Sequence, residues 1–98
     1  MAPYKELDSL LHSQLRLAII SILVSSELAE FTYIKDQTGA TAGNLSIQIS
    51  KLKEAGYIDV EKRFKNNYPQ TLCRITDLGR KKFEKYVDVL RDYINPGK

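Results

Sequence analysis

Apolar side chains recur at helical spacing through the first third of the chain. Three of them predict a helix over about residues 4–12: Leu7, Leu10 and Leu11. A stronger helix is expected after Ser13, its N-cap, because the next apolar residues repeat in the order of a core helix: Leu15, Ala18, Ile19, Ile22 and Leu23. The connection that follows leaves a very short strand open. A short helix over residues 33–38 comes next, with Thr32 as its expected cap.

The stretch from Thr38 to Gly56 carries the most informative pattern. It predicts a tight turn at Gly39, an N-cap at Thr41, a helix over residues 42–55 and a stop at Gly56. Three residues make a narrow apolar stripe: Leu45, Ile49 and Leu52. The opposite side carries amide, hydroxyl and ammonium groups with few acids, whereas a solvated helix face usually alternates Glu with Lys. With the short helix before it, this pattern has the spacing of a helix-turn-helix, whose second helix enters the DNA major groove.

After that helix the period changes to that of a β-strand. Apolar and acidic residues alternate in the order Ile58, Asp59, Val60 and Glu61, and a second strand is predicted over residues 71–75. Between the strands, residues 62–70 are expected to form a long basic tip with three turn-forming residues: Asn66, Asn67 and Pro69. The pattern therefore predicts a β-hairpin.

A closing helix is predicted after a cap at Thr76. Its apolar residues return at helical spacing: Phe83, Tyr86, Val87, Leu90 and Ile94. Together the elements predict one domain over residues 1–98, an α+β winged helix-turn-helix that is mostly helical, with a two-stranded β wing and a long C-terminal helix. The helix-turn-helix is expected over about residues 33–55 and the wing over about 57–75.

Positive charge concentrates in the middle of the chain. The net charge of +3 divides into −2 over residues 1–34, +5 over 35–82 and zero over the remainder. A chain of 98 residues that is 43% hydrophobic suits one small core and leaves little room for a separate ligand-binding domain. A basic middle segment is the expected footprint of a polyanion partner, although solubility alone also accounts for a shift of this size.

Candidate DNA contacts lie on the second helix of the motif and on the wing. Amides there pair bidentately with adenine, lysine pairs with guanine, and the hydrophilic wing suits phosphates or the minor groove. Ile47 faces outward, where the thymine methyl is the apolar group that the major groove displays. The bland alternatives are a solvated helix face and a polar hairpin tip. The candidate residues are Thr41, Ala42, Gly43, Asn44, Ser46, Ile47, Gln48, Lys51, Arg63, Lys65, Asn66, Asn67 and Gln70.

The segments TAGNLSIQISKLKEAGYIDVEKRF and TLCRITDLGRKKFEKY resemble winged helix-turn-helix transcriptional regulators of the MarR and ArsR type. The matching positions are Thr41, Asn44, Leu45, Ser46, Ile49, Lys51, Leu52, Ala55, Gly56, Ile75, Thr76, Gly79 and Arg80. The resemblance covers nearly the whole chain and implies a homodimeric DNA-binding regulator whose terminal helices form the interface. The chain departs from the pattern at Ile47, where the family commonly has a polar or basic residue, and lacks the Cys/His clusters of metal-sensing members.

Surplus apolar surface on the terminal helices, about 4–12 and 77–94, favours a homodimer. The residues expected in its interface are Leu7, Leu10, Tyr86, Leu90, Tyr93 and Ile94. A competing hypothesis is a winged helix that serves as a protein-interaction module, docking a partner through Ile47 and the C-terminal stripe. The two partners expected for the leading hypothesis are double-stranded DNA and a second copy of the chain, and the sequence names no small-molecule effector.

Catalytic and metal chemistry have little support. His12 is the only histidine and Cys73 the only cysteine, so neither has the partners of a metal site or a nucleophilic dyad, and no cofactor is expected. Cys73 shares the strand register of Ile75 and is expected to be a buried small hydrophobe. Without these groupings, an enzyme is not expected. No signal peptide and no apolar run long enough for a membrane helix is seen, so a cytoplasmic protein is expected.

Overall fold

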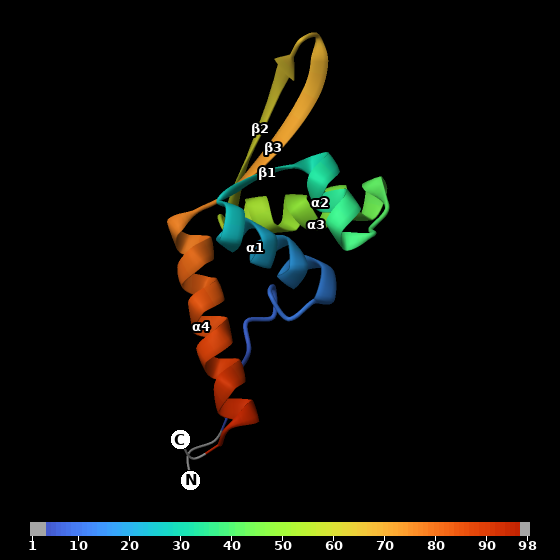
Figure 1. Cartoon of the computed structure of the whole chain (residues 1–98). Coiled ribbons are helices and arrows are strands. Elements are labelled where there is room, and N and C mark those ends of the chain that lie inside the picture. The colour runs from blue at the N-terminus through green and yellow to red at the C-terminus, as the bar shows by residue number, and fades with distance from the viewer. Residues whose placement is uncertain (1–3, 97–98) are drawn as a thin grey trace.

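The computed structural model describes residues 4–96, which form four helices and three strands (Figure 1). In chain order the elements are α1 Gln14–Ser26, β1 Leu28–Glu30, α2 Phe31–Thr38, α3 Ala42–Glu54, β2 Ile58–Lys65, β3 Tyr68–Ile75 and α4 Asp77–Ile94. The helices α1, α2 and α3 form the body, the β2–β3 hairpin rises above it, and α4 extends away from the hairpin (Figure 1). This confirms the predicted α+β winged-helix fold.

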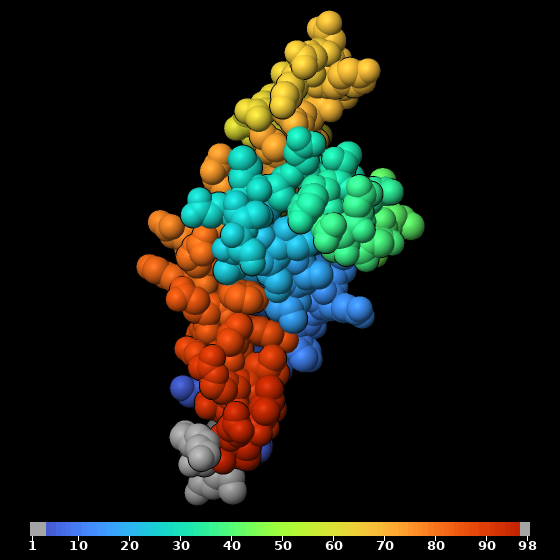
Figure 2. All heavy atoms as spheres, viewed as in Figure 1, coloured from blue at the N-terminus to red at the C-terminus, as the bar shows by residue number. Residues whose placement is uncertain are grey.

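The sheet is antiparallel, with the strand order β1-β3-β2. Strand β1, which the sequence left open, pairs with β3 only near the body, for example Ala29 opposite Cys73. The outer part of the hairpin is therefore two-stranded and stands clear of the helices. It makes the molecule elongated, with principal extents of 59, 25 and 21 Å (Figure 2).

One core joins the helices to the base of the hairpin. Helix α1 crosses the body and packs on α2, α3, α4 and the sheet, as the apolar repeat predicted. The largest fully buried side chains come from every layer: Leu11, Ile19, Ile20, Leu23, Ile34, Leu45, Leu52, Ile58 and Cys73. Burial of these apolar side chains stabilises the body and holds α3 at a fixed angle to the hairpin.

The predicted N-caps of α3 and α4 are confirmed. The Thr41 side chain accepts a hydrogen bond from the Asn44 backbone N–H, and the Thr76 side chain accepts one from Gly79. Gly39 and Gly56 adopt positive φ angles of 70° and 81°, where a side chain would be strained. These local signals set the ends of α2, α3 and α4.

The predicted N-terminal helix over residues 4–12 is wrong, because the segment is extended and then turns. The Asp8 carboxylate accepts hydrogen bonds from the backbone N–H groups of Leu10 and Leu11, which closes a turn in place of a helical one. Farther out, the Tyr4 ring stacks on Tyr93 of α4 at a centroid distance of 4.6 Å. A local turn on Asp8 and a contact with the distant helix α4 together override the leucine spacing.

Two other boundaries differ from the sequence prediction. Helix α2 begins at Phe31 with Glu30 as its N-cap, not at residue 33 after Thr32, because Glu30 is still paired in β1 when the helix starts. The wing tip is a tight turn on Asn66 and Asn67, not a long loop, and Pro69 lies within β3. Both asparagines have positive φ, the conformation of a two-residue hairpin turn, which lets the strands pair up to the tip.

Candidate nucleic-acid interface

Helix α3 is held from one side and exposed on the other. Leu45, Ile49 and Leu52 are at most 5% exposed, so the predicted stripe faces the core. The opposite side holds the candidate helix contacts, which are exposed except for the half-buried Gln48: Thr41, Ala42, Gly43, Asn44, Ser46, Ile47 and Lys51. Ile47 is 55% exposed, which is unusual for an isoleucine in the middle of a helix.

A hollow of about 310 Å³ lies where α3 meets the base of the hairpin. Lys53 of α3 and Lys62 of β2 both line it, together with three hydroxyl-bearing residues. Its lining residues are Phe31, Ser46, Ile49, Ser50, Lys53, Val60, Lys62 and Thr71. Lysines of α3 and of the base of the wing thus line one hollow, where their positive charge favours an anion.

A hydrogen-bonded chain that the sequence reasoning missed runs behind the exposed amides of α3. Arg16 of α1 donates from Nη1 to Oε1 of Gln48 at 2.6 Å and from Nε to the Leu10 carbonyl, also at 2.6 Å. Gln48 Nε2 in turn donates to Asn44 Oδ1 at 3.0 Å. No local signal reveals this contact, because Arg16 and Gln48 are 32 positions apart.

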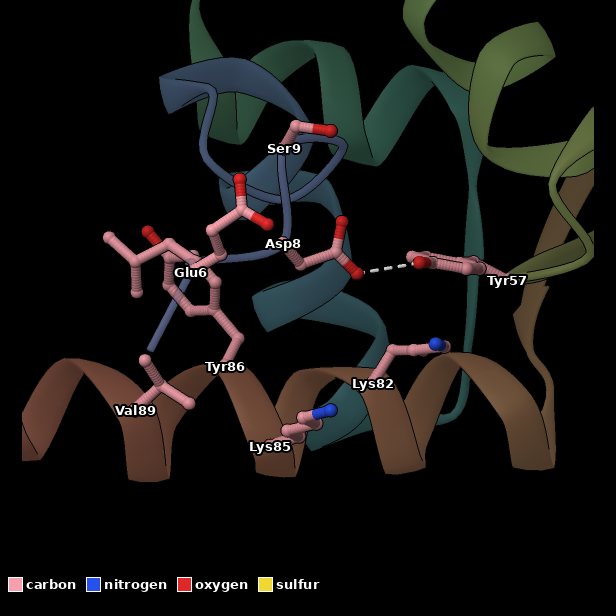
Figure 3. A pocket seen from close by; sticks show the side chains of 9 residues that line it. Glu6, Asp8, Ser9, Tyr57, Lys82, Lys85, Tyr86 and Val89 are labelled. Atoms are coloured by element: carbon pink, nitrogen blue, oxygen red, sulfur yellow. Dashed lines mark hydrogen bonds between the residues drawn. The ribbon is translucent and has the colours of Figure 1, made fainter. Parts of the chain in front are cut away.

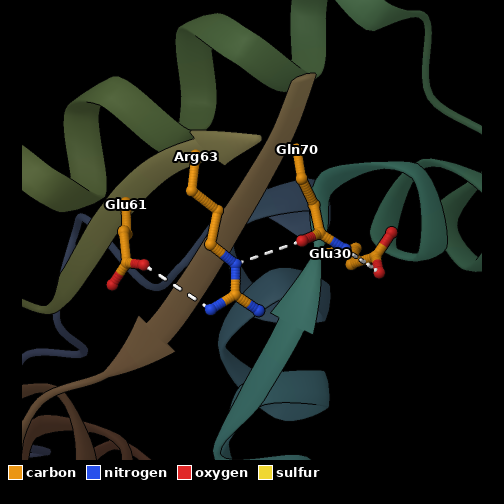
Figure 4. Close-up of polar contacts among 4 residues, drawn as sticks. All are labelled: Glu30, Glu61, Arg63 and Gln70. Carbon is orange, nitrogen blue, oxygen red and sulfur yellow. Dashed lines mark hydrogen bonds and ion pairs between the residues drawn. The ribbon is translucent and has the colours of Figure 1, made fainter. Parts of the chain in front are cut away.

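The wing is less uniformly basic than its composition indicates (Figure 4). Arg63 donates from Nε to Gln70 Oε1 at 3.1 Å, and its Nη1 lies 3.8 Å from a carboxylate oxygen of Glu61. Gln70 also donates to Glu30 on β1 (Figure 4). Glu61 thus lies beside the charge of Arg63, and Glu30 binds Gln70, whereas Lys65, Asn66 and Asn67 are exposed at the tip.

Exposed aromatic rings flank the same tip. Phe64 is 76% exposed and Tyr68 is 75% exposed. Phe64 pairs with Pro69, and Tyr68 pairs with Lys65, in adjacent register positions that face opposite sides of the hairpin. Neither ring braces the tip against the body.

A second hollow, of about 350 Å³, lies between the N-terminal segment and α4 (Figure 3). The Tyr57 hydroxyl donates to Asp8 at 2.6 Å across one side of it (Figure 3). Burial, followed by the hydrogen bond to and negative charge of Asp8, raises the pKa of Tyr57, so the phenol stays a donor at neutral pH. The hollow is lined by Glu6, Leu7, Asp8, Ser9, Tyr57, Lys82, Lys85, Tyr86 and Val89. This bond fastens the N-terminal segment to the body.

The residues predicted for a dimer interface divide into two groups. Tyr86 is only 4% exposed, and its hydroxyl lies 3.0 Å from Nδ1 of His12, so this residue belongs to the core of a single chain. Three leucines are half-buried against that core: Leu7, Leu10 and Leu90. Tyr93 and Ile94 remain 40% and 69% exposed near the end of α4. The extended N-terminal segment runs beside the outer turns of that helix (Figure 1).

The remaining candidates for chemistry are structural. Cys73 is fully buried, as predicted, and burial raises the pKa of its thiol to about 11. Within residues 4–96, no three histidine, cysteine, aspartate or glutamate side chains come together to hold a metal ion. No helix in the same range is long and apolar enough to cross a membrane.

Comparisons with known proteins agree with this geometry. Residues 15–94 match the family model of a winged helix DNA-binding domain. An uncharacterized protein of Methanocaldococcus jannaschii, MJ0432, is 33% identical over 76 residues, which are 78% of this chain and 83% of that protein.

Solved structures share the fold. The transcriptional regulator homologue protein of Pyrococcus horikoshii OT3 superposes with a TM-score of 0.83 and 28% identity over 88% of this chain and 85% of that one. BldR, a transcriptional regulator of Sulfolobus solfataricus, shares the fold with a TM-score of 0.71 and 23% identity, over 85% of this chain and 58% of its own. These matches confirm the winged-helix fold and the resemblance to transcriptional regulators. The chain belongs to the family of winged helix DNA-binding domains found in transcriptional regulators.

Proposed function

We propose that the protein regulates transcription by binding a specific double-stranded DNA site as a homodimer, with α3 in the major groove and the wing on the flanking backbone or minor groove. The exposed side of α3 is the observation that carries the proposal. It combines hydrogen-bonding groups with the exposed Ile47, and no acid interrupts it between residues 41 and 53. If this surface only faced water, the exposed isoleucine would contribute no favourable free energy.

In this arrangement the residues of α3 have separate roles. Hydroxyl and backbone N–H groups at its start, around Thr41 and Gly43, suit phosphate oxygens, and Lys51 extends this contact along the helix. Ser46 and the amides of Asn44 and Gln48 lie where base edges would pass. Ile47 would pack on a thymine methyl, the apolar group exposed in the major groove.

The wing would contribute affinity more than base choice. Lys65, Asn66 and Asn67 extend from its tip, and the flanking Phe64 and Tyr68 offer apolar surface to sugars. Arg63 and Gln70 would contact phosphate only in competition with Glu61 and Glu30, so we expect them to contribute less to DNA affinity than Lys65.

The homodimer rests on the terminal surface. This surface is formed by the N-terminal segment and the end of α4. Tyr86 is buried, so the exposed residues are Tyr4, Tyr93 and Ile94, and the half-buried leucines lie along its edge: Leu7, Leu10 and Leu90. A two-fold contact there would bury these rings and set the two α3 helices for successive major grooves, about 34 Å apart.

Selection of bound fragments from a random duplex DNA pool tests the proposal. We expect an inverted repeat with a thymine in each half-site and binding that weakens steeply with salt. Ile47→Ala should cost about 1 kcal/mol per half-site, and uracil in place of the contacted thymine should cost the wild type the same and the variant almost nothing. Recovery of no preferred sequence would contradict the proposal, and an Ile47→Ala variant that binds DNA normally but loses a protein partner would favour the protein-interaction module.

A further inference from the structure

The chain that links Arg16, Gln48 and Asn44 has a defined direction. A guanidinium group only donates hydrogen bonds, so the Gln48 atom that faces Arg16 at 2.6 Å must be the carbonyl oxygen. The Gln48 nitrogen is then turned toward Asn44, which must accept through its own oxygen at 3.0 Å. One arginine thereby determines which way the oxygen and nitrogen of two side-chain amides face.

Arg16 is itself fixed from behind. Its Nε donates to the Leu10 carbonyl, and the Leu10 N–H donates to Asp8, whose second oxygen accepts from Tyr57. The side chain is half-buried, and its guanidinium is held at both ends, by the Leu10 carbonyl and by Gln48 of α3. A donor held in this way stays in place when DNA approaches.

We propose that Arg16 is a positioning residue that sets base specificity by making the Gln48 and Asn44 amides present N–H donors, not carbonyl acceptors, to the major groove. The inference rests on the proposed placement of α3 in that groove. Each amide oxygen is turned toward a donor within the protein and keeps one lone pair, whereas one N–H of Gln48 and both N–H groups of Asn44 have no such partner among the hydrogen bonds of residues 4–96. The pair would therefore read acceptors on the base edge.

This changes the base class expected at that position. Bidentate pairing with adenine needs one donor and one acceptor from the same amide, because adenine displays N7 and an N6 amino group. Guanine displays two acceptors, N7 and O6, and cytosine displays an amino donor. With their N–H groups facing the groove, Gln48 and Asn44 thus favour guanine, or another acceptor such as thymine O4. The same orientation disfavours cytosine and bidentate pairing with adenine.

The test compares the wild type with Arg16→Met in the random-pool selection and in competition binding with single-base variants of the selected site. Met has similar length and no donor, so both amides are released. We expect the guanine-over-adenine preference facing them to fall roughly tenfold per half-site, the scale of one good base contact. Arg91→Met is the matched control, since it removes the same charge from an exposed position on α4 and should leave the preference unchanged.

Two further variants separate positioning from other roles. In a Gln48→Ala background, Arg16→Met should cause no further change in base preference, whereas a direct phosphate contact by Arg16 would still weaken all sequences alike. Arg16→Lys retains a donor and should restore part of the guanine preference.

In the protein without DNA, the side-chain NH₂ resonances of Gln48 and Asn44 should shift in Arg16→Met and stay in place in Arg91→Met. This readout remains informative if Arg16→Met lowers stability, provided that the variant is measured below its melting temperature. An Arg16→Met protein that selects the same site with the same guanine preference would overturn the inference. A wild type that selects no site would instead refute the proposed function, while the NMR comparison would still decide whether Arg16 orients the amides.

Discussion

Replacing Gly79 by alanine should destabilise the fold strongly, although alanine is the better helix former. Gly79 lies in the first turn of α4, directly against the chain segment that joins α3 to the hairpin. A Cβ atom at this position would lie 2.1 Å from the carbonyl oxygen of Tyr57 and 2.9 Å from its carbonyl carbon. Both are backbone atoms, so no side-chain rotation relieves the clash.

The cost follows from what must move. Bringing that Cβ to ordinary contact distance shifts α4 or the Tyr57 backbone by about 1 Å or more. The Tyr57 carbonyl accepts from the Thr76 N–H at 3.1 Å and from the Thr76 hydroxyl at 2.9 Å, and each bond that is lost costs about 1 kcal/mol. Overpacking adds about 1–3 kcal/mol, and the better helix propensity returns at most about 1 kcal/mol. The net destabilisation is about 2–4 kcal/mol, or a fall of roughly 10–20 °C in Tm.

Thermal and urea unfolding monitored by circular dichroism measure this directly. Gly43→Ala is the matched control, because a Cβ there meets nothing within 4 Å and the residue also lies in the first turn of a helix. We expect its Tm to stay level or rise, whereas that of Gly79→Ala falls. Equal Tm values for Gly79→Ala and the wild type would show that α4 does not approach Tyr57 closely, and the reasoning would fail.

Three further predictions concern the wing, the dimer and the core. Lys65→Ala should flatten the salt dependence of DNA binding by about one unit per protomer, and Arg63→Ala by less because Arg63 is paired with Glu61; equal slopes in binding titrations would contradict this. Removal of the chain after residue 90 should convert the dimer to a monomer in sedimentation equilibrium and weaken DNA binding together with it, whereas a monomeric wild type at tens of micromolar would reject the interface. Burial raises the pKa of Cys73 from 9.0 to about 11, so above pH 9 the unfolded chain releases a proton that the folded chain keeps. Stability to urea should therefore fall as pH rises from 9 to 11, with a shallower fall in Cys73→Ala.

The sequence alone determined the parts of this protein that short-range physics controls. The apolar stripe of α3, its cap at Thr41 and the cap of α4 at Thr76 each depend on neighbours within one helical turn, and all three were predicted correctly. The exposure of Ile47 followed from the same periodicity, since a residue off the stripe must face away from the core. The change to a strand period located the hairpin in the same way.

Tertiary structure decided what depends on residues far apart in the chain. The N-terminal leucines had helical spacing, but the Asp8 turn, its bond to Tyr57 and the stacking of Tyr4 on α4 hold the segment extended. Neither the Arg16–Gln48 contact nor the link from the wing to Glu30 has a local signal, because the bonded residues are 32 and 40 positions apart. A hydrogen bond requires its donor and acceptor to lie within a few tenths of an ångström of the right place, and only the packed core fixes distant elements that closely.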